Sequence, residues 1–476
     1  MKILVAGIIA RYPFGGVTWC SLMYLLGLRA LGHEVLYIED TGECIYDPEQ
    51  NTRSEDPSYG TRYINDALAP FGLGDRWSFV NFNGEYHGVS REDVRAFCGD
   101  ADLFVNLSGG SWFWRDEYVK IPRRVFIDSD PVFTQLAIAK AEGWYVDFFN
   151  TFDHLFTFGA NIGTPASATP TGGFTWHKTW QPVVTELWHT DAPPVRDRFT
   201  TVMTWKIESF TDVDGNKDKE FIKFIDLPRR TPHRFELAVN GPQGLLREHG
   251  WDTVNAMSVS RSLWDYRTFI QGSRAEFGVA KHAYVDSCSG WFSDRTECYL
   301  AAGRPALVQD TGWSAHLPTG AGLLRFSNCE EAIDGLDRIV SDWTMHSRRA
   351  AEIAREYFDA GVVLPRFLGG AISVPLLTAV FIAVGLFGVQ LVGVQFLGVD
   401  QGSFWSQMRG AVELGDVTEG LIKGAVFGVA CSLVAVYEGY NAEPTAEGVG
   451  RATTRTVVIS AVLTLILDYI LTAIML

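Results

Sequence analysis

The feature that most constrains this chain is a long uncharged run near its C-terminal end. Residues 367–399 are 33 consecutive residues without a charge. A helix rises about 1.5 Å per residue, so about 20 apolar residues cross a hydrocarbon core of about 30 Å. The run is therefore long enough to form a membrane-spanning helix.

Two further apolar runs follow. The first, 424–437, is short, but it extends through 420–422 if Lys423 reaches toward the lipid headgroups. The second, 456–476, is interrupted only by Asp468. One such run could be a buried core helix. Three in succession predict an α-helical membrane tail of about three transmembrane helices over residues 366–476.

The residues before this tail have a different chemistry. From residue 366 onward 13 of 111 residues are charged, against 83 of the 365 before it. The formal net charge of the whole chain is −16, which argues against a nucleic-acid partner, because such proteins need a basic surface. The seven cysteines form no C-x-x-C pair, which favours a reducing compartment and argues against a zinc ribbon.

The first 185 residues predict a Rossmann-like α/β domain. An apolar strand over 3–9, a helix over about 17–31 and a second strand over 34–39 form a β-α-β unit. Gly15 and Gly16 lie where the amides of a helix start can face an anion, so they are candidate donor-binding residues. A tight turn of any α/β domain explains the pair equally well.

Two further strands, 102–107 and 125–128, are expected to end at the same edge of this sheet. Asp128 and Asp130 follow the second strand. We expect one of them to be the catalytic base; N-capping of the next helix is the structural alternative. A D-x-D pair can also hold a metal, but two α/β halves make a metal site the weaker interpretation. Residues 160–195 are expected to be an interdomain linker, with His177 as an acceptor-side candidate.

A second α/β pattern follows over residues 196–365. Its expected strands are 200–204, 236–240, 276–279, 306–309 and 322–326, and its expected helices are 293–302, 330–341 and 345–358. Ser293 and Asp294 are plausible N-cap residues of the first of these helices. The start of that helix predicts a diphosphate site, to which Arg295 could add a charged hydrogen bond.

The remaining candidates for donor binding are polar residues near the same strand ends. They are Lys206, Lys281, Thr296 and Glu297. Arg295 could instead form a surface ion pair, and each lysine could be solvated. We expect no metal and no cofactor.

The tail contains stretches that carry a family resemblance. PRFLGGAISVPLLTAVF (365–381), GVDQGSFWSQM (398–408) and YEGYNAEPTAEGVGRATTRTVV (437–458) resemble the C-terminal half of MlaE-type permeases of lipid ABC transporters. The resemblance implies a lipid bilayer, and possibly an Mla-type ATPase or a homodimer, as partners. The first half of that family has no counterpart here, so an incomplete transporter is implied. With Arg348, Arg349, Arg355 and Arg366 before the first span, we expect a multi-pass protein of the bacterial inner membrane with its soluble domains in the cytoplasm.

The first 368 residues resemble a second family. The opening MKILVAGIIARYPFGGVTWC and the stretch WFSDRTECYLAAGRPALVQDTGW (291–313) are similar to GT-B glycosyltransferases, which have two Rossmann-like domains. In that family a glutamate about five residues before the glycine of an A-x-G-x-P turn holds the donor ribose. Here Cys298 stands five residues before Gly303, so the resemblance leaves the contact to Glu297, or to Asp294 and backbone groups.

Together these features predict a glycosyltransferase at the cytoplasmic membrane face. It would move a sugar from a nucleotide-diphospho-sugar to an unknown acceptor. The alternatives are a permease component carrying a non-catalytic transferase-like domain, or a chimera joined at VVLPRFL (362–368), a segment that suits both families.

Overall fold

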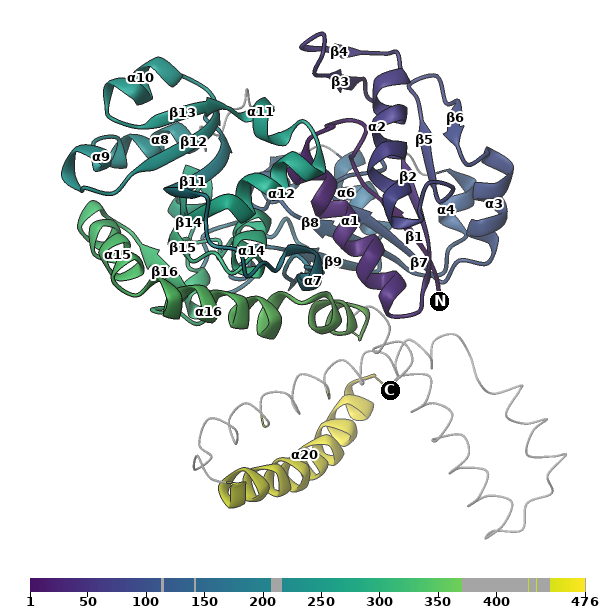
Figure 1. The fold of residues 1–476 in the computed structure, drawn as a ribbon. Coiled ribbons are helices and arrows are strands. Elements are labelled where there is room, and N and C mark those ends of the chain that lie inside the picture. The colour runs from purple at the N-terminus through teal and green to yellow at the C-terminus, as the bar shows by residue number, and fades with distance from the viewer. Residues whose placement is uncertain are drawn as a thin grey trace, which may run out of the picture. The chain divides into compact units, whose positions relative to one another are not determined.

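The computed structural model describes residues 1–112, 115–140, 143–206, 216–369 and 446–475, together with residues 427 and 434. The chain divides into two compact units, residues 1–371 and 372–476. The first unit contains two α/β lobes, each built on a twisted sheet with helices on its faces (Figure 1). The predicted α/β fold with two Rossmann-like sheets is therefore confirmed.

The first lobe is built on an eight-stranded sheet of order β10-β9-β8-β7-β1-β2-β5-β6. All neighbours pair in parallel except β5 and β6. Its strands are β1 (Lys2–Ala6), β2 (Glu34–Glu39), β5 (Trp77–Val80), β6 (Tyr86–Gly88), β7 (Leu103–Leu107), β8 (Arg124–Asp128), β9 (His154–Thr157) and β10 (Trp176–Lys178). Its central strands are buried on both faces, as their continuous apolar sequences require.

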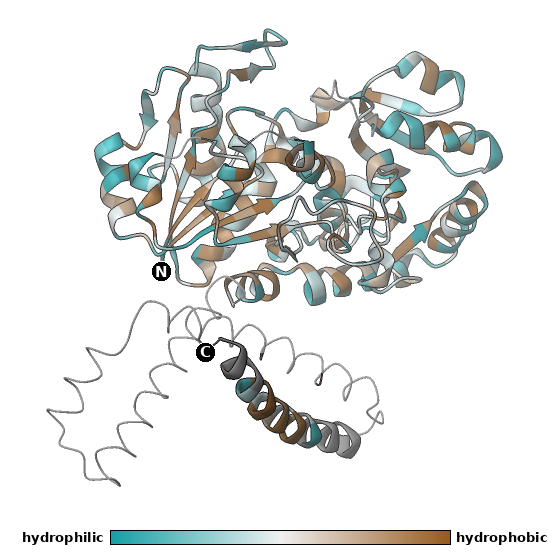
Figure 2. Ribbon diagram, turned by 180° about the vertical axis from the view of Figure 1, so that it is seen from behind, coloured by the Kyte–Doolittle hydropathy of each residue, from teal (hydrophilic) through white to brown (hydrophobic). Residues whose placement is uncertain are grey.

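The other elements of the first lobe surround this sheet. They are α1 (Gly15–Ala30), the hairpin of β3 (Ile45–Asp47) and β4 (Thr52–Ser54), α2 (Ser58–Leu68), a 3₁₀ turn (Ala69–Phe71), α3 (Arg91–Gly99), α4 (Asp116–Val119), α5 (Phe133–Lys140), α6 (Trp144–Asn150) and α7 (Thr185–Trp188). Side chains such as Phe104 and Phe126 pack the core between sheet and helices. Figure 2 shows the hydrophobic residues concentrated on the strands of this lobe.

The second lobe is built on a six-stranded, all-parallel sheet of order β13-β12-β11-β14-β15-β16. Its strands are β11 (Arg196–Thr204), β12 (Phe235–Asn240), β13 (Asp252–Asn255), β14 (Ser273–Gly278), β15 (Ala306–Gln309) and β16 (Leu323–Phe326). Its helices are α8 (Lys217–Phe221), α9 (Leu227–Arg230), α10 (Gln243–Glu248), α11 (Ala256–Ser260), α12 (Leu263–Gly272), α13 (His282–Asp286), α14 (Asp294–Ala301), α15 (Cys329–Ser341) and α16 (Trp343–Ile353), with 3₁₀ turns at Ile222–Phe224 and Trp313–Ala315.

The predicted linker, residues 160–195, has more structure than expected. It contains β10, which extends the first sheet, and α7. It also ties the lobes together, because Asn161 donates its side-chain amide to the Cys288 carbonyl at 3.0 Å and Ser167 donates to the Ser287 carbonyl at 2.9 Å. The segment is therefore a bonded seam between the lobes.

The chain returns from the second lobe to the first before the first unit ends. After α16 it continues through a π-helical turn (Ala354–Phe358) into a helical stretch, 360–369. Leu364 is fully buried, and Gly27 of α1 leaves room for it, since a Cβ on Gly27 would lie 2.5 Å from Leu364. Phe367 packs on Phe156 of β9 with ring centroids 4.8 Å apart. The end of the unit is thus part of the core of the first lobe.

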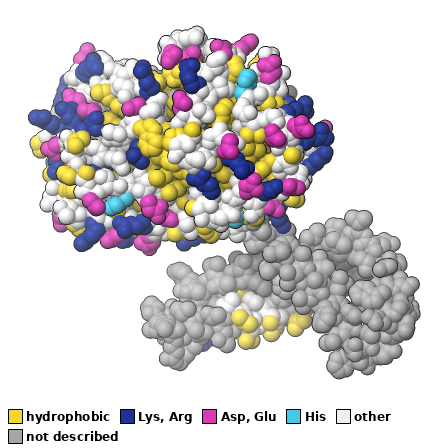
Figure 3. Space-filling model, turned by 45° about the vertical axis from the view of Figure 1, so that its right-hand side comes forward, with side chains coloured by type: hydrophobic (Ala, Val, Ile, Leu, Met, Phe, Trp, Pro, Cys, Tyr) yellow, Lys and Arg dark blue, Asp and Glu magenta, His cyan; other side chains and the backbone are white. Residues whose placement is uncertain are grey.

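The visible face of the first unit carries charges of both signs. Figure 3 shows Lys and Arg side chains interspersed with Asp and Glu, and apolar side chains between them. This face therefore carries no extended basic footprint.

The second unit is described mainly through α20 (Ala446–Met475), a helix of 30 residues. Large apolar side chains along it are exposed (Figure 3): Val457, Val458, Ile459, Val462, Leu465, Ile466 and Tyr469. The third predicted span falls on this helix; nearly all of the other two lies outside the described residues. Within the part of the chain that the structure describes, no helix combines the length and the apolar character needed to cross a membrane.

Candidate functional site

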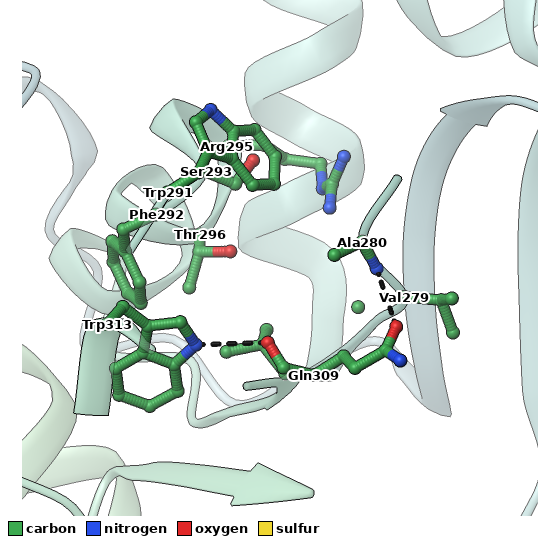
Figure 4. Close-up of a pocket in the computed structure, with 11 residues that line it drawn as sticks. Val279, Ala280, Trp291, Phe292, Ser293, Arg295, Thr296, Gln309 and Trp313 are labelled. Atoms are coloured by element: carbon green, nitrogen blue, oxygen red, sulfur yellow. Dashed lines mark hydrogen bonds between the residues drawn. The ribbon is translucent and has the colours of Figure 1, made fainter. Parts of the chain in front are cut away.

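A small pocket lies at the carboxyl ends of β14 and β15 in the second lobe. The aromatic side chains of Trp291, Phe292 and Trp313 line it (Figure 4). The first residues of α14 form another wall. Ligands of open α/β sheets bind outside the carboxyl ends of the strands, so the pocket lies where a ligand is expected.

Gln309, at the end of β15, fixes the shape of this pocket. Its side-chain oxygen accepts the amide of Ala280 at 3.1 Å, and its side-chain nitrogen donates to Glu220 at 2.6 Å. Its backbone carbonyl accepts the indole N–H of Trp313 at 3.0 Å (Figure 4). Two strand ends and one aromatic wall are therefore held by a single residue.

The start of α14 supplies backbone donors to the pocket. Ser293 is its N-cap residue, and Ser293 and Thr296 are both buried and line the pocket. The Ser293 side chain makes no capping bond to the helix. The first amides of a helix lack intrahelical acceptors and carry partial positive charge, so this end favours an anion.

Arg295 lines the same pocket but is already paired. Its Nε donates to Glu276 of β14 at 2.7 Å, and its Nη1 donates to the Val202 carbonyl at 2.9 Å. Burial alone would lower the pKa of Arg295, but the Glu276 carboxylate raises it overall. Arg295 is thus a fixed cation whose charge is largely balanced by Glu276, and not the exposed arginine that the sequence suggested.

Lys217, the first residue of α8, is the cation that sequence analysis missed. It is 8% exposed, and its Nζ donates to the carbonyl of Val279, a pocket-lining residue, at 2.6 Å. Burial lowers the pKa of Lys217 well below its usual value, and the nearby charges of Arg295 and Lys281 lower it further. In the sequence this lysine belongs to the charged run KDKE, which is typical of a solvated helix face, so nothing in the pattern distinguished it.

The other two lysines predicted for donor binding lie elsewhere. Lys281 follows β14 but points to the first lobe, where its Nζ donates to both oxygens of Asp130 at 2.8 and 2.7 Å. Lys206 is exposed and directly precedes residues 207–215, which lie outside the described part. Neither lysine is among the residues that line the pocket.

Asp128 and Asp130, the predicted base candidates, have different surroundings. Asp128 is 2% exposed and accepts bonds from Thr134 and Gln135 of α5, each at 2.8 Å. Burial raises its pKa to about 6, although these donors oppose the shift. Asp128 therefore holds side chains at the start of α5, and these bonds are not the backbone N-cap of the structural alternative. Asp130 is half exposed and reaches the second lobe through Lys281.

Gly15 and Gly16 are covered by the second lobe. A Cβ on Gly15 would lie 2.4 Å from the carbonyl oxygen of Ser262 and 2.6 Å from the Cβ of Tyr266. A Cβ on Gly16 would lie 3.2 Å from the Tyr266 ring. The expectation that this pair cradles the donor is therefore replaced by a packing role: the glycines allow α12 to approach α1.

Asp294 and Glu297 are not among the residues that line the pocket. Glu297 is 1% exposed; one carboxyl oxygen accepts the backbone amide of Gln181, and the other has no hydrogen-bond partner among the described residues. Burial raises the pKa of Glu297 well above its usual range, and the charge of Asp294 adds to the effect. This placement gives no support to the predicted ribose contact of Glu297.

His177 lies on the edge strand β10. Its ring packs against His154 and Phe156 of β9, with centroids 5.7 and 5.5 Å away. It is not among the pocket-lining residues, so the acceptor-side role predicted for it finds no support in this placement. Among the residues that the structure describes, no group of three or more His, Cys, Asp or Glu side chains could hold a metal ion.

Comparison with known proteins finds a similarity in the end of the chain. Residues 360–474 match the family described as Permease MlaE. A 115-residue stretch is 50% identical to the intermembrane phospholipid transport system permease protein MlaE of Haemophilus influenzae, covering 24% of this chain and 44% of that protein. A probable ABC transporter permease protein of Rickettsia typhi is 38% identical over 111 residues, 23% of this chain and 43% of its own.

The resemblance predicted for the tail is thus confirmed. The chain spans less than half the length of these curated relatives. The match also begins at residue 360, inside the helical stretch 360–369 that packs into the first unit.

The solved structures similar to the remainder include glycosyltransferases. An alpha-glucosyltransferase in complex with UDP has a TM-score of 0.49 and 12% identity, covering 77% of this chain and 98% of its own. The Anabaena protein HepE in complex with UDP and glucose has a TM-score of 0.47 and 12% identity, covering 79% and 100%. AviGT4, a glycosyltransferase involved in avilamycin A biosynthesis, has a TM-score of 0.44 and 13% identity, covering 78% and 97%.

Proposed function

We propose that the first unit is a glycosyltransferase that moves a sugar from a nucleotide-diphospho-sugar to an acceptor hydroxyl. The observation that carries the proposal is the start of α14 together with Arg295 at one pocket, with the buried Lys217 bonded to the pocket-lining Val279. Because Glu276 balances Arg295, Lys217 is left without a carboxylate partner within hydrogen-bond distance among the described residues. A bound diphosphate would supply that partner.

The proposed chemistry uses these groups in two ways. As the acceptor oxygen bonds to the anomeric carbon of the sugar, the bond from that carbon to the diphosphate breaks and its electron pair leaves with the nucleoside diphosphate. Helix amides and buried cations stabilise such developing negative charge strongly in a low-dielectric site. Asp130, the half-exposed acid of the first lobe, takes the hydroxyl proton as general base.

The test is binding of nucleoside diphosphates to the full chain in detergent micelles. UDP, GDP, ADP, CDP and TDP are titrated by calorimetry. Replacing Lys217 by Met should weaken the best ligand roughly 10- to 100-fold, the scale of a hydrogen bond to a charged group. Lys219→Met, an exposed lysine of the same helix, serves as the matched control and should bind like the wild type. Equal affinity in both variants would remove Lys217 from the site.

We further propose that the tail holds this enzyme at the cytoplasmic membrane face. The support is the match of residues 360–474 to a permease family, together with the three apolar runs of the sequence. An Mla-type ATPase or a second copy of the chain are the partners that the tail would take. The lipid bilayer is then the third partner, besides the donor and the acceptor.

A second candidate function rests on the same match. At 50% identity over 115 residues, the tail could belong to a permease component that carries a non-catalytic transferase-like domain. The enclosed Glu297 and the neighbouring Cys298 also favour this second candidate, because they are typical of a degenerate donor site. Restoration of lipid transport by the full chain, in a strain lacking its own permease, would favour this candidate. Failure of genomic DNA to amplify across codons 340–400 would instead favour a chimera.

A further inference from the structure

The two lobes meet at a cluster of charged and aromatic side chains around Asp130. Lys281, the residue before α13, donates to both carboxylate oxygens of Asp130, and the hydroxyl of Tyr284 donates to the same carboxylate. Asp130 follows β8 of the first lobe, whereas Lys281 and Tyr284 belong to the second. The second lobe therefore grips the acid of the first lobe with two donors.

The ammonium group of Lys281 contacts two aromatic rings in addition to the Asp130 carboxylate. It lies 4.8 Å from the ring centroid of Phe133 and 5.4 Å from that of Tyr284, within the range of cation–π attraction. The Lys281 side chain is 20% exposed and that of Asp130 is 54% exposed. The cation is thus enclosed, while the carboxylate keeps an open side.

The loop that presents Asp130 has a strained backbone. Val132, a β-branched residue, has φ of +73°, a conformation that such residues rarely adopt. Its amide donates to the side-chain oxygen of Gln135 at 2.6 Å, and its side chain is buried against Ala283 and Tyr284 of α13. Packing against the second lobe therefore maintains the strained turn.

The same loop touches the wall of the pocket. The indole N–H of Trp291 donates to the carbonyl of Ser129 at 3.2 Å, and Trp291 is one of the residues that line the pocket. Its ring lies 4.4 Å from that of Tyr284. Asp130 is consequently fixed beside the pocket, next to the residue that contacts its wall.

We propose that Lys281 and Tyr284 are positioning residues that orient the Asp130 carboxylate to accept the proton of the acceptor hydroxyl. This inference rests on the proposed function, in which Asp130 is the base. It replaces the earlier expectation that Lys281 binds the donor, because the nitrogen of Lys281 is engaged by Asp130 and does not line the pocket. Asp130 then receives both hydrogen-bond donors only while the two lobes are in contact.

The experiment separates binding from turnover in the full chain. Nucleoside diphosphate affinity is measured by calorimetry, and turnover is followed as release of UDP, GDP or ADP from the corresponding glucose donors, with water as acceptor. Lys281→Met should lower turnover at saturating donor about 10- to 100-fold, as expected for losing hydrogen bonds to a charged group. Its affinity for the nucleoside diphosphate should stay within about twofold of the wild type, a difference well below that of one hydrogen bond.

Two further variants distinguish positioning from a general loss of structure. Tyr284→Phe keeps the ring and removes only the hydroxyl, and Lys281→Arg keeps a cation that can donate to both oxygens of Asp130. The first should show a smaller loss than Lys281→Met and the second should restore most of the turnover. In the double variant Asp130→Asn with Lys281→Met, turnover should be no lower than in Asp130→Asn alone, because both changes act through one group.

Other outcomes would overturn the assignment. A loss of nucleoside diphosphate affinity in Lys281→Met would make Lys281 a donor ligand. Additive losses in the double variant would show that Lys281 acts independently of Asp130. Wild-type protein that neither binds a nucleoside diphosphate nor releases one would contradict the proposed function itself, and the positioning role with it.

Discussion

Glu39, at the end of β2, is the residue around which the turn after β1 is built. Its carboxylate accepts the backbone amides of Ala10 and Arg11 at 2.7 and 2.6 Å and the hydroxyl of Tyr37 at 3.0 Å. The side chain is fully buried, and burial raises its pKa to about 7 although all three donors oppose the shift. Folding therefore favours proton uptake at Glu39.

The stability of the protein should consequently depend on pH through Glu39. Its folded pKa of about 7 exceeds the ordinary value of 4.5, so its contribution is complete below pH 4.5 and is lost as pH rises through 7. The difference amounts to roughly 3 kcal/mol. Urea unfolding at pH 5 and pH 8 should show a smaller pH effect in Glu39→Gln than in the wild type. The exposed Glu49→Gln is the control, and an unchanged pH effect in Glu39→Gln would contradict the argument.

At the residue scale, the sequence predicted the kinds of side chain at the pocket better than it predicted which individual residues line it. Ser293 and Thr296 do lie at the pocket, because a strand end followed by a helix start fixes their place. Lys217 could not be found, because its burial depends on contacts with Val279, which lies far along the chain. Glu297 could not be excluded either, because it directly follows the pocket-lining Thr296, and a step of one residue turns a side chain by about 100° around the helix.

The helices α1 and α12 lie side by side where the lobes meet (Figure 1). The indole N–H of Trp19 in α1 donates to the carbonyl of Leu263 in α12 at 2.7 Å, and its ring packs against Trp188 and Trp264. The start of α1 is closest to α12 at Gly15. This pair of helices therefore forms an apolar contact between the lobes, separate from the polar contact at Asp130.

Substituting Gly15 should test that contact. In Gly15→Ala the new Cβ would meet the backbone carbonyl of Ser262, which can move only if α12 moves. We expect a loss of unfolding free energy of about 1–3 kcal/mol, as for overpacking of a core. Nucleoside diphosphate affinity should be unchanged, since Gly15 does not line the pocket.

Gly244→Ala provides the control. Gly244 is also helical, but open space surrounds the position of its Cβ, so this variant should be as stable as the wild type or slightly more stable. Loss of nucleotide affinity in Gly15→Ala, without loss of stability, would restore Gly15 as a donor-binding residue.

Elements were predictable where the sequence was continuously apolar. Strands 34–39 and 306–309 have the bounds expected from the sequence, because each contains a continuous apolar run that a polar residue closes. The strands β9 and β10 were not predicted: each has at most four residues, and the surrounding glycine, threonine and proline residues mask any period. Only pairing with the sheet stabilises them.

The first unit depends on residues on both sides of the predicted boundary at 365. Leu364, Phe367 and Leu368 are buried in the first lobe. A chain ending at residue 371 should therefore keep its fold and its nucleoside diphosphate affinity. A chain ending at residue 359 should unfold at lower temperature, since each buried apolar side chain contributes about 1.5–3 kcal/mol.

Thermal unfolding and nucleotide titration of the two truncated chains check this expectation. Membrane fractionation of the full chain and of the chain ending at 371 tests the anchor at the same time: only the full chain should require detergent for extraction. Equal stability of the two truncated chains would show that residues 360–371 are dispensable for the fold.

The return of residues 360–369 to the first lobe also determines which lobe receives a mechanical force applied to the tail. In sequence the tail follows the second lobe, but Leu364 and Phe367 pack on Gly27 of α1 and on Phe156 of β9. A pull on the tail is therefore received first by the lobe that carries Asp130. In mechanical terms, under the proposed membrane attachment, the first lobe is the fixed end and the second lobe, with its pocket, is held through its contacts with the first.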